Sequence, residues 1–357
     1  MRTTLLCLLA VLSCPLQMAT AGDFDNYEEL QALISSMERE GIYPEGELTA
    51  LFSMVKRQNK ALDAIARPAE KTKEWKDYKN QFLSAERINN GVEFWQRYNK
   101  ALNLASEQYG VPPEIIVAII GVETKYGANK GNFKVLDALT SLAFDYPPRA
   151  PFFRKELRTF LQLAKEQNLN PLETYGSYAG AMGFGQFMPS SWRNLAVDFD
   201  ADGKIDLLNN PIDAIGSVAN YFKANGWQTG LPVVSRAKII ADNYDDAPNN
   251  KDLKAVSTLN ALSALGLVPR DTVKASDLAV NAIRLQGDNG AEFWLAFDNF
   301  YVITRYNRSL LYAMAVFQLS ESIKEVRNQF KIGTDAFNLS HTPVNEPISP
   351  STNPPSL

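Results

Sequence analysis

Apolar residues recur at intervals of three and four along most of the chain, the spacing that places them on one face of a helix. Two such stretches occupy 27–41 and 47–66, and a helical pair is expected over 82–110. The same pattern continues over 112–227, where short glycine and proline breaks separate the helices. The sequence therefore predicts a mainly helical protein.

The pattern changes near the C-terminal end. The stretches AVNAIRLQG (279–287), EFWLAF (292–297) and YVITRY (301–306) are short, rich in aliphatic and aromatic residues, and separated by DNGA and DN. They predict a small antiparallel sheet. One more amphipathic helix is expected over 307–326, and the Pro, Ser, Thr and Asn content of 333–357 is typical of a disordered tail. The predicted fold class is mainly α (α+β).

The charge balance and the N-terminal residues indicate which partners and which cellular location to expect. The formal charge is -4 and no basic block stands out, which argues against a nucleic acid partner. Residues 1–21 carry one arginine, a short apolar run and a small-residue site ending at Ala21, which predicts a secretory signal and a periplasmic product. An alternative interpretation takes VLSC as a lipoprotein box, with membrane attachment only through acylated Cys14. We favour the soluble product because Leu12 is bulky for that box.

Cysteine and histidine are nearly absent from the expected mature chain. Both cysteines, Cys7 and Cys14, lie in the leader, and the single histidine is His341 in the tail. A disulfide, a thiol nucleophile, a histidine-based triad and a multi-histidine metal site are thereby excluded for the folded body.

A carboxylate ends an apolar run in the stretch VPPEIIVAIIGVETKYG. On a helix, Glu123 lies on the same stripe as Ile116 and Ile120. Burying an unpaired carboxylate is costly, so the group is expected to have a partner or a use for a raised pKa. The alternative is an acid at the end of a helix that turns to solvent beside Lys125.

A glycine-rich stretch, GSYAGAMGFGQFMPSSW, follows at 176–192. Its close glycines, Gly180, Gly183 and Gly185, suit positions where the backbone approaches another group or takes a positive φ. Its aromatic and amide side chains resemble the lining of a sugar site, and no lysine followed by Ser or Thr marks a phosphate loop. The alternative is a glycine-rich junction between helices.

The motifs GVETKYG, YAGAMGFGQFMPSSW and NPIDAIGSVANYFKANGW occur in this order. Together they resemble the membrane-bound lytic transglycosylase B family, peptidoglycan-cleaving enzymes with a lysozyme-like core, over roughly 24–330. The resemblance implies a helical N-terminal domain at 22–110, a lysozyme-like catalytic core with an EF-hand-like loop at 111–230, and a helical segment, small β subdomain and closing helix at 231–332. Peptidoglycan glycan strands are the expected partner, with other cell-wall enzymes as further candidates.

The resemblance also implies the chemistry. It makes Glu123 the sole catalytic acid and base, with a pKa raised by desolvation so that it can donate a proton near neutral pH. An ordinary glycosidase needs a second carboxylate, and none accompanies Glu123 in its motif. The substrate's C6 hydroxyl would attack C1 instead of water and leave a 1,6-anhydromuramoyl end. A hydrolytic muramidase on the same fold and a non-catalytic glycan-binding protein remain as alternatives.

Other positions match the family's cleft. The resemblance assigns contacts with the substrate or the acid to Ser177, Gln186, Tyr221, Tyr306, Asn307 and, more weakly, Tyr78. Where the family often has two adjacent arginines, Pro148 precedes Arg149, so only Arg149 is available for the substrate's carboxylate or peptide stem. For each aromatic residue the alternative is packing in the core.

The stretch DFDADGKIDLLNNPID at 198–213 predicts a calcium site. Asp198, Asp200 and Asp202 alternate before a glycine, as the acids of an EF-hand loop do, and the Lys204 carbonyl would be a further ligand. The final glutamate of that loop is missing, since Asn209 occupies its place. The resemblance assigns the closing role to Asp213, with Asp206 acting through water. The ion would be structural, and the alternative is a solvated acidic turn.

Overall fold

The computed structural model describes residues 22–66, 73–271, 273 and 278–340, with side chains up to 329. The predicted leader, Cys14 and His341 lie outside these residues. The helices are α1 (Glu28–Arg39), α2 (Glu47–Phe52), α3 (Asn59–Ile65), α4 (Trp75–Tyr78), α5 (Ala85–Arg97), α6 (Asn99–Tyr109), α7 (Pro113–Thr124), α8 (Val135–Asp145), α9 (Ala150–Glu166), α10 (Pro189–Leu195), α11 (Pro211–Ala224), α12 (Leu259–Ala264), α13 (Asp298–Tyr306) and α14 (Leu310–Ser340). The strands are β1 (Phe133–Lys134), β2 (Tyr175–Gly176), β3 (Val234–Ile239), β4 (Ser257–Thr258), β5 (Leu267–Pro269), β6 (Ala279–Gly287) and β7 (Gly290–Phe297). The predicted fold, mainly helical with a small antiparallel sheet, is confirmed.

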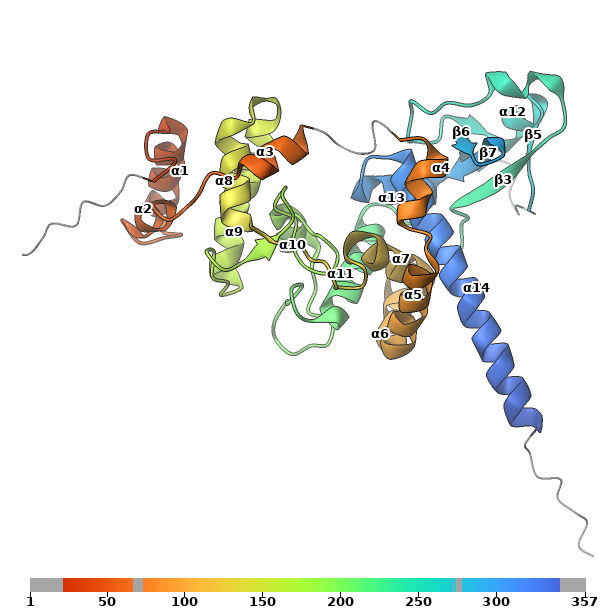
Figure 1. Cartoon of the computed structure of the whole chain (residues 1–357), viewed down its shortest axis with the longest axis horizontal. Helices are drawn as coiled ribbons and strands as arrows, with labels where there is room; N and C mark the ends of the chain where they lie inside the picture. Colours follow the sequence, from red (N-terminus) through yellow and green to blue (C-terminus); the bar gives the residue numbers. More distant parts are fainter. Residues whose placement is uncertain (1–21, 67–72, 272, 274–277, 341–357) are drawn as a thin grey trace, which may run out of the picture.

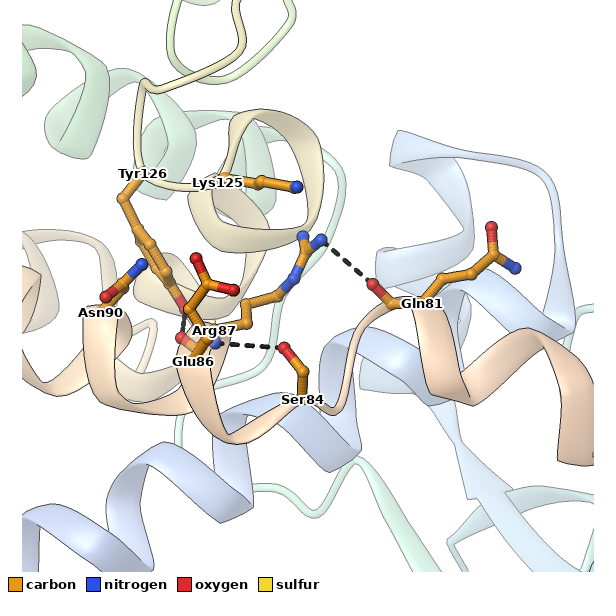
Figure 2. Close-up of a pocket in the computed structure, with 7 residues that line it drawn as sticks. All are labelled: Gln81, Ser84, Glu86, Arg87, Asn90, Lys125 and Tyr126. Carbon is orange, nitrogen blue, oxygen red and sulfur yellow. Dashed lines mark hydrogen bonds between the residues drawn. The ribbon is translucent and has the colours of Figure 1, made fainter.

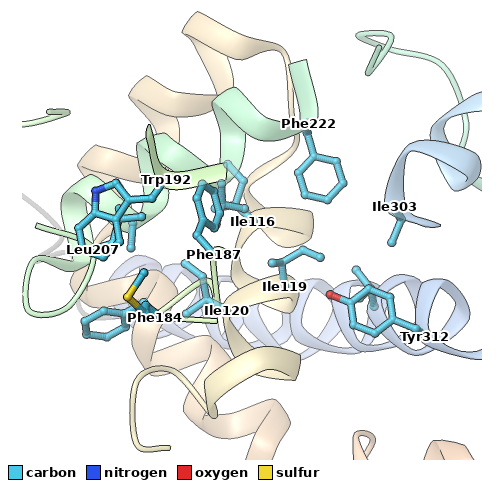
Figure 3. Close-up of a cluster of buried hydrophobic side chains, with 14 of the residues drawn as sticks. Ile116, Ile119, Ile120, Phe184, Phe187, Trp192, Leu207, Phe222, Ile303 and Tyr312 are labelled. Carbon is cyan, nitrogen blue, oxygen red and sulfur yellow. The ribbon is translucent and has the colours of Figure 1, made fainter. Parts of the chain in front are cut away.

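Helix α7 is the centre of the larger core. Every residue from Ile115 to Gly121 is buried, and α5, α6, α11 and α14 pack around the helix. Figure 3 shows Ile116 and Ile120 of α7 among aromatic side chains from other segments. The helix is thus apolar on all sides, rather than along the single stripe that the spacing suggested. Its other acid, Glu114 in the first turn, is also buried and pairs with the Lys324 ammonium at 2.8 Å.

The helices before α7 pack against two different parts of the structure. Helices α1 to α3 lie beside α8 and α9, whereas α5 and α6 lie beside α7 (Figure 1). The Tyr43 hydroxyl donates to the Leu161 carbonyl at 2.9 Å, and the Tyr27 hydroxyl donates to Asp145 at 2.7 Å. The helices of 22–110 therefore contact two different parts of the chain, and the status of this segment as a domain stays a prediction.

The sheet has five strands in the order β4-β6-β7-β3-β5, and all neighbouring strands are antiparallel. Gly287 pairs with Gly290 across a two-residue turn, and the φ of 111° at Gly290 requires glycine there. A small core of its own lies between the sheet and α12, formed by residues such as Leu262, Val280 and Leu295.

One predicted strand was wrong. Residues 301–306 belong to α13, where the buried Phe300 and Ile303 stand three residues apart and face the core. A short run of aromatic and β-branched residues fits either structure by composition, and only the packing of the helix on its neighbours selects between them. Strands β3, β4 and β5, which complete the sheet, were not predicted.

The closing helix is longer than expected. Helix α14 begins at Leu310 and runs to Ser340, past the expected end at 326 and into the segment predicted as a disordered tail from 333. The first proline after Leu310 is Pro343, so nothing in this stretch forces the helix to end earlier. Among the described residues, no helix combines the length and the apolar character needed to cross a membrane.

Candidate active site

Glu123 lies in the last turn of α7, at a sharp change of backbone direction. Lys125, Tyr126 and Gly127 follow with φ of 51°, 61° and 93°, so two non-glycine residues hold the left-handed conformation. Such strain persists only where the surroundings fix it. Here the buried Thr124 donates to the Phe184 carbonyl at 2.8 Å and accepts from the Gly127 amide at 3.0 Å. The end of α7 is thereby tied to the glycine-rich stretch.

The Glu123 carboxylate is partly buried and accepts a hydrogen bond from the Tyr312 hydroxyl at 2.5 Å. Tyr312 comes from the first turn of α14 and is itself buried. Burial raises the pKa of Tyr312 well above its ordinary value, and the charge of Glu123 raises it further. The phenol therefore remains a proton donor to Glu123 throughout the neutral range. The alternative of an acid turned to solvent beside Lys125 does not describe this arrangement.

Glu123 opens into a cleft of about 620 Å³. The lining brings together seven of the predicted site residues, which are Glu123, Arg149, Ser177, Gln186, Tyr221, Tyr306 and Asn307. They come from segments spread over more than half of the chain. Glu123 is the only carboxylate in the lining that the described residues form.

The glycine-rich stretch forms one wall of the cleft. Gln186, with a φ of 50°, donates its side-chain amide to the carbonyls of Lys130 at 3.1 Å and Gly183 at 3.0 Å, which leaves its side-chain oxygen as an acceptor. The Ser177 hydroxyl accepts from the Ala181 amide at 3.0 Å and keeps its own proton to donate. At Gly183 a Cβ would stand 2.2 Å from a backbone carbonyl, so no other residue fits. The expected close backbone approach is confirmed there.

Two tyrosines, Tyr221 and Tyr306, also line the cleft. The Tyr306 hydroxyl donates to the Gly185 carbonyl at 2.6 Å, and the Tyr221 hydroxyl donates to the Arg305 carbonyl at 2.7 Å. Their ring centroids lie 4.7 Å apart. Burial, followed by the charge of Glu123, raises the pKa of Tyr306 well above its ordinary value. Tyr306 therefore joins α13 to the glycine-rich stretch, Tyr221 joins α11 to α13, and both line the cleft.

Of the two remaining predicted site residues, Arg149 is exposed and Tyr78 is buried. Arg149 is exposed in the cleft, with its guanidinium 4.4 Å from the ring centroid of Phe152, and no carboxylate within the described chain pairs with it. Tyr78 does not line the cleft. It is buried, packs against Phe82 with ring centroids 5.1 Å apart, and lies near enough to Tyr312 to affect its pKa.

A second, smaller pocket lies beside the end of α7 (Figure 2). The Arg87 guanidinium donates to the Gly121 carbonyl at 2.6 Å and to the Gln81 carbonyl at 3.0 Å, while the Tyr126 hydroxyl donates to the Arg87 carbonyl at 2.8 Å. Burial lowers the pKa of Arg87. The Gly121 carbonyl, which already accepts from the Lys125 amide at 3.1 Å, thus gains a second donor, and the three bonds together hold the turn that follows Glu123.

Three acids of the predicted calcium loop lie close together. Oxygen atoms of Asp198, Asp200 and Asp202 converge within 4.8 Å of one another. The Asp198 carboxylate accepts from the amides of Asp202 at 3.1 Å and Gly203 at 2.8 Å, and the Lys204 amide donates to Asp202 at 2.8 Å. Several hard oxygen atoms in one small loop are the donor set that calcium prefers.

Asp213 and Asp206 are not among the three carboxylates that converge, although the charges of Asp200 and Asp198 reach Asp213 and raise its pKa, after the larger effect of burial. The two oxygens of the buried Asp213 accept from the amides of Phe199 at 2.9 Å and Asp206 at 2.8 Å, so its carboxylate closes the loop through the backbone. Asp206 accepts from the amides of Leu208 and Asn209 in its own turn. Each Asp213 oxygen accepts one amide and keeps lone pairs that a cation could use, so its role as a calcium ligand stays a prediction.

Comparison of the chain with known proteins identifies its family. Residues 25–321 match the family described as the Transglycosylase SLT domain, and the chain belongs to this family. It is 42% identical over 321 residues to membrane-bound lytic murein transglycosylase B of Escherichia coli (strain K12), with 87% of each chain covered.

Solved structures agree with this assignment. The catenated lytic transglycosylase SltB1 from Pseudomonas aeruginosa is 51% identical, with a TM-score of 0.81, and the match covers 85% of this chain and all of that one. The Escherichia coli lytic transglycosylase Slt35, solved in complex with calcium, is 42% identical, with a TM-score of 0.80 and coverage of 86% and 96%.

Tyr312 and Thr124 are the site residues that sequence reasoning missed. Tyr312 stands six positions after Tyr306 in the same TRYNRSLLYA motif, and Thr124 is part of GVETKYG. Their place in matched motifs was the available signal. Neither side chain could be paired with its partner without the fold.

Proposed function

We propose that this protein cleaves the β-1,4 bond between N-acetylmuramic acid and N-acetylglucosamine in peptidoglycan, with Glu123 as both acid and base. Lytic transglycosylation is the activity of the family to which the chain belongs. The observation that carries the role of Glu123 is its isolation as the one carboxylate in the described cleft lining. A retaining glycosidase needs a second carboxylate at about 5 Å, and an inverting one needs it farther away.

The proposed reaction needs only one proton carrier. Protonated Glu123 gives its proton to the glycosidic oxygen as the bond from C1 to that oxygen breaks. The carboxylate then takes the proton of the muramoyl C6 hydroxyl as that oxygen bonds to C1, which forms the 1,6-anhydro end and restores the acid. The muramoyl N-acetyl group would cover C1 between the steps. The Tyr312 hydroxyl would hold the carboxylate in place through both transfers.

The remaining cleft residues would position the glycan. The free acceptor oxygen of Gln186 and the available proton of Ser177 suit the amide of an N-acetyl group. Arg149 is proposed to meet the substrate's carboxylate or peptide stem, and Asn307 to bond sugar hydroxyls. Tyr221 and Tyr306 would give the sugar an aromatic wall, whereas Tyr78 is proposed to support Tyr312 from the core.

Calcium is proposed as a structural ion. The convergence of three carboxylates supports it, as does the calcium complex of the Escherichia coli relative. Asp198, Asp200 and Asp202 would hold the ion with the Lys204 carbonyl, and Asp213 would close the site, with Asp206 acting through water. The ion would remove the repulsion among these carboxylates and leave the chemistry to Glu123.

The proposed location is the periplasm, where peptidoglycan glycan strands are the substrate. Attachment to a membrane would require acylation of Cys14, and the soluble form remains our preference. Contacts with other cell-wall enzymes remain a prediction. The name of the Escherichia coli relative, which describes a membrane-bound enzyme, is compatible with an envelope location.

Product analysis on purified sacculi tests the proposed reaction. A lytic transglycosylase releases muropeptides lighter by one water than those of a hydrolase, because no water is consumed. Mass spectrometry should therefore find anhydromuropeptides. Reducing ends would instead identify a hydrolytic muramidase, and the release of no muropeptide would favour a glycan-binding protein.

A further inference from the structure

A hollow beside the catalytic cleft carries an excess of positive charge. Lys251 and Lys254 line it from one loop, and Arg305 and Arg308 line it from the end of α13 and the residues after it. The two arginines also line the catalytic cleft, so the two hollows adjoin. We refer to this hollow as the cationic pocket.

The four cations of the cationic pocket have no carboxylate partner among the residues that the structure describes. Within the described chain, none of them forms an ion pair. The one carboxylate in the lining, Asp252, accepts a hydrogen bond from the Asn249 side chain at 2.8 Å. Like charges that lie close together repel one another. These four cations nevertheless gather in one place, although the formal charge of the chain is -4. The cluster is therefore not a general property of the surface.

The loop that carries the two lysines is fastened to the sheet. The Asn281 side chain, only 1% exposed, donates to the carbonyls of Asn249 at 2.9 Å and Asp252 at 2.8 Å. The Asn250 side chain donates to the Arg284 carbonyl at 2.6 Å and accepts from the Arg284 amide at 2.9 Å. A binding loop that is already ordered loses less entropy when its ligand arrives.

We propose that the cationic pocket binds carboxylates of the peptide stem that the muramoyl residue carries. This inference rests on the proposed function, because it requires a muramoyl unit in the adjoining cleft. The stem is attached to muramic acid next to the cleaved bond and contains several carboxylates, whereas the sugar rings between stems are neutral. A guanidinium binds a carboxylate through two parallel hydrogen bonds, and the arginines nearest the cleft suit that contact.

The test compares two substrates in the full chain. Glycan strands that carry peptides are compared with the same strands after an amidase has removed the peptides. The double variant Lys251→Gln/Lys254→Gln removes two charges from exposed side chains that do not line the catalytic cleft. The matched control is Lys100→Gln/Lys238→Gln, which removes two exposed charges elsewhere.

We expect the preference of the wild type for peptide-bearing strands, measured as the ratio of kcat/KM values, to fall roughly three- to tenfold in the Lys251→Gln/Lys254→Gln variant. The loss should lie in KM, and the control should keep the wild-type ratio. An equal loss on both substrates, or no change on either, would overturn the inference. A wild type that cleaves neither substrate would instead contradict the proposed function.

Discussion

The Tyr312 hydroxyl donates to the Glu123 carboxylate at 2.5 Å, and the two residues stand 189 positions apart in the chain. The bond joins the end of α7 to the first turn of α14. The position of the proposed acid therefore depends on the closing helix as well as on its own motif. Loss of this one contact should affect turnover before it affects folding.

Tyr312→Phe tests that dependence. Phenylalanine keeps the buried ring and removes the hydroxyl, so Glu123 loses a hydrogen bond to a charged group, worth about 1.5–3 kcal/mol. We expect kcat to fall roughly tenfold or more, with KM close to that of the wild type. Release of anhydromuropeptides measures both. A kcat within a factor of two of the wild type would show that Tyr312 does not position the acid.

Calcium should stabilise the fold by binding the native loop only. We expect the melting temperature of the wild type to rise with calcium relative to chelator, and we expect Asp200→Ala to lose most of that rise. Asp63→Ala, which removes an exposed carboxylate from α3, is the matched control and should keep it. Equal melting temperatures for the wild type in calcium and in chelator would exclude a calcium site.

Tyr43 makes the stability sensitive to alkaline pH. Burial raises the pKa of Tyr43 to about 12, above its ordinary value of 10.0. Because the folded pKa lies above the unfolded one, this contribution is complete below pH 10 and is lost as the pH rises through 12. Tyr43→Phe should cost about 1 kcal/mol at pH 7 through the lost hydrogen bond to Leu161.

Denaturant unfolding from pH 7 to 11 checks this prediction. The difference in unfolding free energy between the wild type and Tyr43→Phe should shrink as the pH rises above 10. Other buried tyrosines affect both proteins equally and cancel in the comparison. A difference that stays constant over this range would mean that the Tyr43 hydroxyl is not shielded from solvent in the native state.

Short sequence motifs correctly predicted the elements of this structure that depend only on a few neighbouring residues. The apolar run before Glu123 gave α7, and the close glycines gave the tight wall near Gly183, because spacing and backbone freedom act over a few residues. The hairpin of β6 and β7 was also predicted, since its strands flank a DNG turn. The helical form of 301–306 was not, because packing outweighed its β-like composition.

Contacts between distant segments were beyond sequence reasoning. The hydrogen bond of Tyr312 to Glu123 and that of Tyr43 to the Leu161 carbonyl of α9 join residues more than a hundred positions apart. The role expected for Tyr78 depended on the same kind of information and stays a prediction; the structure shows that side chain buried. In the calcium loop, the three alternating acids converge as expected, whereas Asp213 bonds to the backbone.

Glu123→Gln examines the proposed acid and base itself. Glutamine keeps the shape and can still accept a hydrogen bond from Tyr312, but it cannot transfer the protons. General acid and base help is worth ~10² to 10⁴-fold, and the described cleft lining offers no second carboxylate to replace it. Glu107→Gln, an exposed change on α6, is the matched control. Melting temperatures should show that both variants are folded.

The most direct measurement is the rate of anhydromuropeptide release by Glu123→Gln beside that of the wild type and of Glu107→Gln. We predict that Glu123→Gln loses at least about a hundredfold in turnover while it still binds glycan strands and melts no lower than the wild type, because the change removes a partly buried charge. A folded Glu123→Gln protein that keeps more than about a tenth of wild-type turnover would contradict the assignment and make Glu123 a structural residue.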